Sequence, residues 1–138
     1  MRLQLALNVG NLEEAIDFYA KMFDTPPLKI REGYANFAID QPPLKLVLFE
    51  GDGEPGSINH LGVEVEAAAE VLAAEARLSG SGLETTGVDD TLCCFAEKTE
   101  TWVDGPDGAR WEWYVKTGDS EVLESVVVDS AGQASCCG

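Results

Sequence analysis

Two stretches, Gln4-Leu-Ala-Leu-Asn-Val9 and His60-Leu-Gly-Val-Glu-Val65, decide the fold because they repeat one pattern roughly 56 residues apart. In both, apolar residues alternate with small or polar ones, which is the period of a half-buried strand. Each stretch is followed by a helical pattern. Asn11 can cap a helix over residues 12–23, and an alanine-rich helix over residues 66–78 follows the second copy. The chain therefore begins the same module twice.

Three strand-like segments follow each predicted helix, separated by residues that favour turns. They lie near 28–31, 34–40 and 43–50 in the first half, and near 83–87, 91–97 and 100–103 with 109–116 in the second. The sequence thus predicts an α+β fold in which two βαβββ modules form curved mixed sheets around a cleft. The expected boundaries are a first module at 1–50, a linker at 51–57, a second module at 58–117 and a flexible C-terminal tail at 118–138.

The composition and net charge argue against nucleic acid and anionic membranes as binding partners. The 138 residues are 45% hydrophobic and 25% charged, as in an ordinary soluble globule. A formal net charge of -16 would repel nucleic acid and an anionic membrane surface. No apolar run approaches the roughly 20 residues that span a bilayer, and the first residues do not resemble a signal peptide. We expect a cytoplasmic protein with a small-molecule partner, as a monomer or a homodimer.

Equivalent positions of the two modules should converge on the cleft. The first residue of the repeat is Gln4 in one copy and His60 in the other. In the closing strand, Glu112 is a carboxylate between Trp111 and Trp113, and a charge among aromatic residues needs either solvent or a ligand. By itself, a lone histidine is more often a core or surface residue than a metal ligand. On spacing alone, both interpretations stay open.

The four cysteines form two adjacent pairs, Cys93-Cys94 and Cys136-Cys137. Neighbouring cysteines close a disulfide only with strain, so reduced vicinal thiols are the better interpretation. Cys93 and Cys94 can bind one soft ligand jointly only from a loop or a distorted strand end, because adjacent strand residues face opposite ways. We therefore expect a mobile loop over 91–102 that carries the thiols inward. Alternatively, they are small apolar core residues. The tail pair is either a disordered end or a pair of accessory thiols.

Three segments together resemble the vicinal oxygen chelate superfamily, which includes glyoxalase I, extradiol dioxygenases and bleomycin-resistance proteins. They are residues 11–19, Asn59-His-Leu-Gly-Val-Glu-Val65 and Gly105-Pro-Asp-Gly-Ala-Arg-Trp-Glu112, and the resemblance covers about residues 2–116. It implies metal ligands at Gln4, His60 and Glu112. The slot of a fourth ligand falls near Val47, which cannot bind metal. Three protein ligands leave open positions of the kind that an iron(II) oxygenase needs.

A closer resemblance is to the organoarsenical C–As lyases of the ArsI group. It rests on Gly33-Tyr-Ala-Asn-Phe-Ala-Ile39, Pro42-Pro-Leu-Lys-Leu-Val-Leu48 and Cys93-Cys-Phe-Ala96. The resemblance implies an Fe(II)- and O2-dependent enzyme that converts trivalent methylarsenic or aromatic arsenicals to inorganic arsenite. Cys93 and Cys94 would bind the arsenic, which is soft and prefers thiolates. Ni, Co or Mn could occupy the same metal site in vitro.

The sequence offers further candidate residues and alternative functions. Tyr34, Phe37 and Trp111 are candidates to line the cleft, and Cys136 and Cys137 are candidate accessory thiols. One alternative function is non-catalytic sequestration of a thiophilic metal or metalloid such as Cd(II). Another is a glyoxalase-like isomerase or a transferase on the same scaffold, although Val47 in the fourth slot speaks against a glyoxalase.

Overall fold

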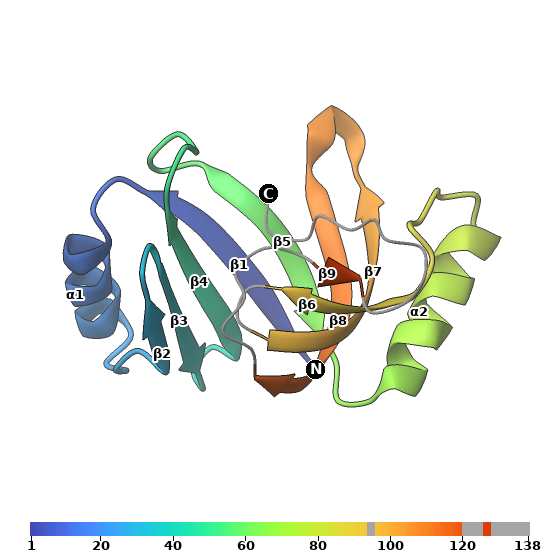
Figure 1. The fold of residues 1–138 in the computed structure, drawn as a ribbon, viewed down its shortest axis with the longest axis horizontal. Coiled ribbons are helices and arrows are strands. Elements are labelled where there is room, and N and C mark those ends of the chain that lie inside the picture. Colours follow the sequence, from blue (N-terminus) through green and yellow to red (C-terminus); the bar gives the residue numbers. More distant parts are fainter. Residues whose placement is uncertain (94–95, 120–125, 128–138) are drawn as a thin grey trace. The chain divides into compact units, whose positions relative to one another are not determined.

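The computed structural model describes residues 1–93, 96–119 and 126–127 and divides into two compact units. The N-terminal unit comprises Arg2–Leu61, and the C-terminal unit comprises Gly62–Gly138 together with Met1. Each unit is built on one βαβββ module, as Figure 1 shows by colour along the chain, so the predicted fold class is confirmed. The boundary between the units falls inside the strand Ile58–Glu64. This strand neighbours the first strand of the chain in the sheet.

The N-terminal unit places its strands in the order β2-β3-β4-β1-β5. Their bounds are Arg2–Val9 for β1, Lys29–Arg31 for β2, Tyr34–Ile39 for β3, Leu44–Glu50 for β4 and Ile58–Glu64 for β5, which starts in this unit. Strand β1 is parallel to β4, and β2, β3 and β4 are antiparallel. Helix α1 (Leu12–Met22) begins where Oδ1 of Asn11 accepts a hydrogen bond from the Glu14 amide at 2.9 Å, so the predicted cap is confirmed.

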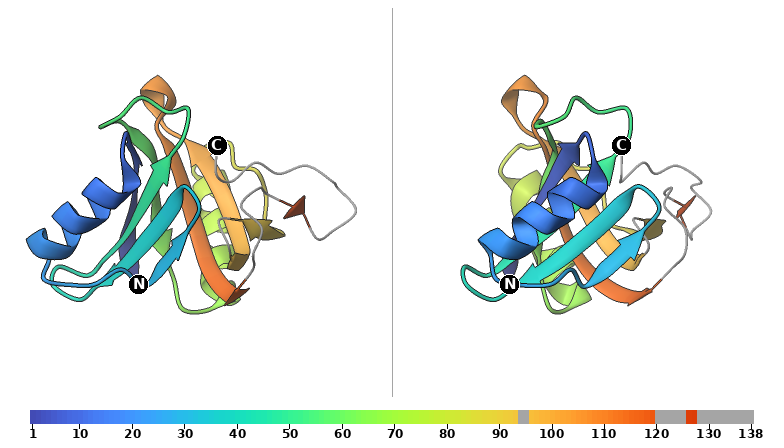
Figure 2. Two further views of the ribbon diagram at one scale, coloured as in Figure 1. Left: turned by 60° about the vertical axis from the view of Figure 1, so that its left-hand side comes forward. Right: turned by 90° about the vertical axis from the view of Figure 1, so that its left-hand side faces the viewer.

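The two faces of the N-terminal sheet differ in chemistry because side chains alternate along each strand. One face carries a core of Phe37, Ile39, Leu46 and Leu48. Helix α1 packs on this face with its apolar stripe, and Figure 2 shows the helix lying across the strands. The opposite face is polar at β1, where Gln4 and Asn8 are buried on either side of Ala6. This polar face bears the candidate site.

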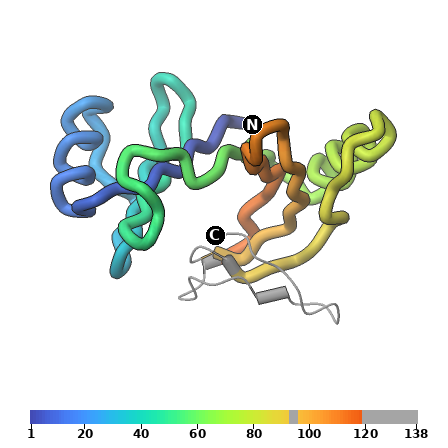
Figure 3. Tube along the Cα trace, turned by 90° about the horizontal axis from the view of Figure 1, so that it is seen from above, coloured from blue at the N-terminus to red at the C-terminus, as the bar shows by residue number. Residues whose placement is uncertain are grey.

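The C-terminal unit places its strands in the order β5-β8-β7-β6-β9. Its elements are α2 (Ala68–Gly80), β6 (Asp89–Cys93), β7 (Ala96–Asp104), a short 3-10 turn (Pro106–Gly108), β8 (Arg110–Asp119) and β9 (Val126–Val127). Helix α2, drawn in yellow-green in Figure 3, buries Val71 against Val63, Val65 and Val115. No helix in the described part of the chain is long and apolar enough to cross a membrane.

Two expectations for the second module are wrong. Residues 83–87 form no strand, and only an isolated bridge joins Thr85 to Val103; the first strand after α2 begins at Asp89. The expected loop over 91–102 is instead mostly an antiparallel hairpin of β6 and β7, in register from Asp89↔Glu100 to Cys93↔Ala96. Two side-chain hydrogen bonds join its strands: Thr91 donates to Glu100 at 3.0 Å, and Thr99 donates to Asp90 at 2.6 Å. Of the expected tail, residues 118–119 belong to β8, 126–127 form β9, and the rest lies outside the described residues.

Candidate metal and thiol site

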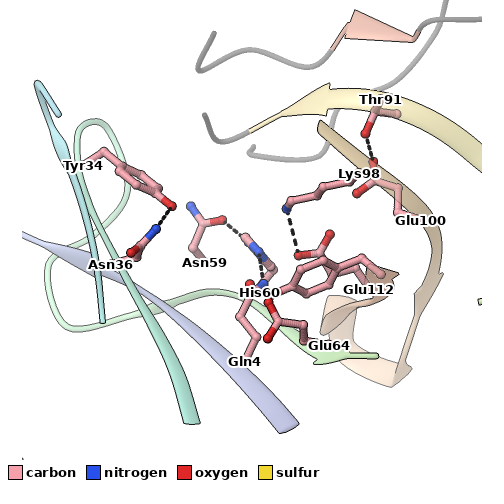
Figure 4. Close-up of polar contacts among 11 residues, drawn as sticks. Gln4, Tyr34, Asn36, Asn59, His60, Glu64, Thr91, Lys98, Glu100 and Glu112 are labelled. Carbon is pink, nitrogen blue, oxygen red and sulfur yellow. Dashed lines mark hydrogen bonds and ion pairs between the residues drawn. The ribbon is translucent and has the colours of Figure 1, made fainter. Parts of the chain in front are cut away.

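The first residues of the two repeats meet in the N-terminal unit. Gln4 on β1 and His60 on β5 are 3% and 2% exposed, and Nε2 of Gln4 lies 3.0 Å from Nε2 of His60. Figure 4 shows this contact between the two strands. The register of the repeat therefore does place these two predicted ligands side by side.

A second hydrogen bond defines which nitrogen of His60 carries the proton. Its Nδ1 lies 2.8 Å from Oδ1 of Asn59, which can only accept. Nε2 of Gln4 can only donate, so Nε2 of His60 accepts and Nδ1 donates. The two contacts are mutually consistent with one neutral imidazole whose Nε2 lone pair points toward Gln4. This is the form in which a histidine binds a metal.

The same polar face continues onto β3 and β4. The hydroxyl of Tyr34 accepts a hydrogen bond from Nδ2 of Asn36 at 2.8 Å, and Oδ1 of Asn36 is buried without a hydrogen-bond partner among the described residues. The centroid of the Phe49 ring lies 5.5 Å from that of the Tyr34 ring and 6.2 Å from that of the His60 ring. Val47 pairs with Ala6 on this face and is buried, so the predicted empty ligand slot is apolar.

Of the three aromatic residues expected to line the cleft, two lie on other faces. Phe37 is fully buried in the core under α1, on the face opposite Gln4, so that expectation is not met. Trp111 precedes Glu112 on β8, and adjacent side chains of a strand face opposite ways. Only Tyr34 shares the face of a predicted ligand, as the pairing of Tyr34 with Phe49 and of Phe49 with Asn8 requires.

Glu112 lies in the C-terminal unit, fully buried on β8. Its Oε1 is 3.5 Å from Nζ of Lys98 on β7, and that ammonium also lies 4.6 Å from the ring centroid of Tyr114. Lys98 is itself only 6% exposed. A buried carboxylate stays ionised only when a cation or hydrogen bonds compensate its charge, and Lys98 supplies that cation.

Glu100 adds a second buried carboxyl beside this ion pair. Burial, followed by the negative charge of Glu112, raises the pKa of Glu100 from 4.5 to about 8, although Lys98 and a hydrogen bond from Thr91 at 3.0 Å work in the opposite direction. With a pKa of about 8, one proton stays with the carboxyl pair at neutral pH. Figure 4 shows the Lys98 and Thr91 contacts.

Lys98 and Glu100 were not predicted as site residues from the sequence. A long charged side chain is almost always exposed, so Lys and Glu in a strand pattern usually indicate the solvent face. In β7 these residues are buried instead. Lys98, Glu100 and Trp102 alternate along β7, and Trp102 pairs with Glu112 across the ladder. The alternate spacing of Lys98, Glu100 and Trp102 was the signal available in the sequence.

The predicted thiols are described in part. Cys93 is the last residue of β6 and pairs with Ala96, two positions along the ladder from the pair of Thr91 and Lys98. Cys94, Cys136 and Cys137 lie outside the described residues. Joint binding of arsenic by Cys93 and Cys94 therefore stays a prediction.

The donor types of the predicted ligands fit a divalent transition metal. Imidazole, amide oxygen and carboxylate together resemble the two-histidine, one-carboxylate sets of iron(II) oxygenases, with an amide in place of one imidazole. Within residues 1–93, 96–119 and 126–127, no cluster of three histidine, cysteine, aspartate or glutamate side chains is arranged to hold a metal. The predicted set differs from such a cluster because one of its members is Gln4.

Comparison with known proteins places this fold and these residues in a family. The chain belongs to the glyoxalase/bleomycin resistance protein/dioxygenase superfamily, whose model matches residues 3–113. A relative from Thermomonospora curvata, named trivalent organoarsenical cleaving enzyme, is 52% identical over 137 residues, covering 99% of this chain and 87% of the relative. The cadmium-induced protein CadI of Mycobacterium bovis is 51% identical over 139 residues, covering 99% of this chain and 91% of that protein.

A solved structure confirms the fold independently. The Mn(II)-bound glyoxalase from Novosphingobium aromaticivorans superposes with a TM-score of 0.62 at 18% sequence identity. The match covers 87% of this chain and 40% of the glyoxalase chain. At this identity the likeness concerns the arrangement of strands and helices alone.

Proposed function

We propose that the protein is an Fe(II)- and O2-dependent lyase that cleaves the C–As bond of trivalent organoarsenicals, methylarsenite and aromatic arsenicals, and releases inorganic arsenite. The observation that carries the proposal is the buried contact of Gln4 with His60, which joins the two repeat positions. The 52% identical relative named for organoarsenical cleavage supports the substrate class. The adjacent thiols Cys93 and Cys94 support it chemically.

His60, Gln4 and Glu112 are the residues that would hold the metal. Bound Fe(II) supplies open coordination positions and the one-electron chemistry that O2 requires. His60 already offers the unprotonated Nε2. Gln4 presents its amide nitrogen to His60, so it has to rotate the amide to offer the oxygen instead. Lys98 places a cation 3.5 Å from the buried carboxylate of Glu112.

Cys93 and Cys94 would hold the substrate through arsenic. Trivalent arsenic is soft, and two thiolates on one chain bind it after a single encounter. Trivalent methylarsenicals are neutral at pH 7, so the net charge of -16 does not repel them. We place this chemistry in the cytoplasm, because there the thiols stay reduced.

Atom balance fixes the fate of the methyl carbon. If arsenic stays trivalent and one O2 is consumed, CH3As(OH)2 + O2 gives As(OH)3 + CH2O. The carbon loses four electrons and O2 gains four. No additional reductant is required, and formaldehyde is the expected second product.

The test is to load the reduced protein with Fe(II), add methylarsenite in air and separate the arsenic species over time. Arsenite should appear, and it should disappear in His60→Ala and in the double variant Cys93→Ser/Cys94→Ser. The matched thiol control is Cys136→Ser/Cys137→Ser, which should still form arsenite because the tail pair is at most accessory. Methylarsenite that is never cleaved by the Fe(II)-loaded protein in air would refute the lyase.

A second candidate function is sequestration of a soft metal or metalloid by the same thiols. The 51% identical relative named as a cadmium-induced protein favours it. Sequestration predicts tight, stoichiometric binding of Cd(II) or methylarsenite that depends on Cys93 and Cys94 but not on His60. The lyase predicts that His60→Ala abolishes turnover while binding of methylarsenite persists.

A further inference from the structure

A chain of side-chain hydrogen bonds runs from His60 to the loop before β5. Nδ1 of His60 donates to Oδ1 of Asn59 at 2.8 Å, and Nδ2 of Asn59 donates to Oδ1 of Asn8 at 3.1 Å. Nδ2 of Asn8 then donates to Oγ of Ser57 at 2.9 Å, and that hydroxyl donates to the carbonyl oxygen of Glu54 at 2.5 Å. Every member lies in the N-terminal unit, so the chain is complete within one compact body.

The loop fixes the far end of this chain. The backbone amide of Asn8 donates to the carbonyl of Ser57 at 2.9 Å, and the amide of Gly56 donates to the carbonyl of Asn8 at 2.8 Å. Gly53 lies so close to the side-chain amide of Asn8 that a Cβ at position 53 would overlap Cγ, Oδ1 and Nδ2 of Asn8. Asn8 is only 8% exposed. Its amide is therefore held with nitrogen toward Ser57 and oxygen toward Asn59.

The orientation of each side-chain amide in this hydrogen-bond chain determines the orientation of the next. With its oxygen fixed toward Asn59, Asn8 requires the amide nitrogen of Asn59 to face it, and the oxygen of Asn59 is then left for His60. An acceptor at Nδ1 holds the proton there and leaves Nε2 as the lone-pair nitrogen. An amide oxygen achieves this without a charge, whereas a carboxylate would favour the imidazolium. The chain of hydrogen bonds thus selects the Nδ1–H tautomer of His60.

We propose that Asn59 is the positioning residue of His60: held in turn by Asn8 and the Gly53–Ser57 loop, it keeps the proton on Nδ1 and presents Nε2 to the metal. The tautomer part stands on the hydrogen bonds alone, and the metal part rests on the proposed function. Partners of ligand histidines commonly change metal affinity by about 10- to 100-fold when removed.

The experiment uses the fact that His60 is the only histidine of the chain. Full-length protein labelled with 15N-histidine gives two ring nitrogens whose chemical shifts report the tautomer without any assignment problem. The variants are Asn59→Leu, which removes the acceptor at similar volume, and Asn59→Asp, which restores one. The matched control is Asn11→Ala, which removes the cap of α1 in the same unit and leaves the His60 contacts intact.

Mn(II) is the metal probe, because it prefers nitrogen and oxygen ligands to thiolates, and loss of its free EPR signal measures binding. His60→Ala gives the baseline for Mn(II) held by the acidic surface. We expect the Nδ1–H tautomer in the wild type and a shift toward Nε2–H in Asn59→Leu. In Asn59→Asp the proton should stay on Nδ1, and the added carboxylate should raise the share of the doubly protonated ring. Site-specific Mn(II) affinity should fall at least tenfold in Asn59→Leu, and it should be unchanged in Asn11→Ala.

Two results would overturn the inference: a wild type with the proton on Nε2, or an Asn59→Leu variant whose ring-nitrogen shifts and Mn(II) affinity equal those of Asn11→Ala. If Asn59→Leu does not fold, the wild-type tautomer and the Asn59→Asp spectrum still decide. The proposed function fails in a different way. Equal Mn(II) binding by the wild type and His60→Ala would remove His60 from the metal site, while the tautomer comparison would still decide the role of Asn59.

Discussion

Replacing Glu100 by glutamine should change how the stability of the metal-free protein depends on pH. Glu100 is 2% exposed and lies close to Glu112 and to the ammonium of Lys98. Its pKa is about 8 in the folded protein and 4.5 in the absence of these surroundings. The folded state therefore keeps a proton that the unfolded chain releases, at every pH between these values.

The sign follows from proton linkage. Because the folded state binds the extra proton, the free energy of unfolding falls as pH rises from about 4.5 to about 8, by at most about 1.4 kcal/mol per pH unit. Between pH 5 and pH 7 the upper limit is about 3 kcal/mol. Glu100→Gln keeps the shape and cannot titrate, so this slope should disappear in the variant. The variant should be more stable than the wild type at pH 7 and should lose that advantage toward pH 5.

The assay is urea unfolding of both proteins at pH 5, 6, 7 and 8 with a chelator present. The quantity that decides is the difference between the two free energies of unfolding at each pH. Glu97→Gln is the control, because Glu97 lies on the same strand but is exposed, so it corrects for the general effect of removing one negative charge. A wild-type-minus-variant difference that stays within about 0.5 kcal/mol from pH 5 to pH 7 would refute the account of a proton held by the buried carboxyl pair.

Three further predictions concern the same molecule. Lys98→Met leaves buried carboxyls without their cation and should lower the free energy of unfolding at pH 7 by about 3 kcal/mol, measured in urea; a loss below about 1 kcal/mol would show that the pair is not buried in solution. Gly53→Ala places a methyl group against the amide of Asn8 and should cost about 1 to 3 kcal/mol, measured by thermal unfolding, and should move the ring-nitrogen signals of His60; unmoved signals would contradict the coupling. Turnover of methylarsenite should release formaldehyde and arsenite in equal amounts, measured by derivatisation of the aldehyde, and methanol in its place would require an additional reductant.

The sequence was most informative where its pattern was conventional. The strand repeat at Gln4 and His60, the Asn11 cap and the three strands that follow α1 were all predicted close to their observed positions. In these elements apolar residues point to the core and polar ones to the other side, so alternation identifies both the strand and its faces. The same repeat identified Gln4 and His60 as partners before any geometry was known.

The second module was harder to predict because its inward face is polar. Thr91, Lys98 and Glu100 are buried, although such residues usually indicate surface. The loop over 91–102 was expected for another reason, namely that two adjacent cysteines can bind one ligand jointly only outside a regular strand. Asn8 and Asn59 were missed for a related reason. Asparagine in a short sequence window usually indicates a turn, and only the register of β1 and β5 shows that the two amides meet.

The two units bury metal-ligand candidates of different charge. A metal-binding histidine has to be buried without a charge, and a metal-binding glutamate has to be buried with one. In the N-terminal unit, Gln4 and Asn59 contact the two ring nitrogens of His60, and neither side chain brings a charge. The C-terminal unit meets the second with Lys98, and it adds Glu100, whose retained proton keeps the cluster close to neutral. Substitutions in the amide chain should therefore change which nitrogen is available, whereas substitutions at Lys98 or Glu100 should change charge and its dependence on pH. A single substitution that altered both the His60 tautomer and the pH slope would contradict this division of roles.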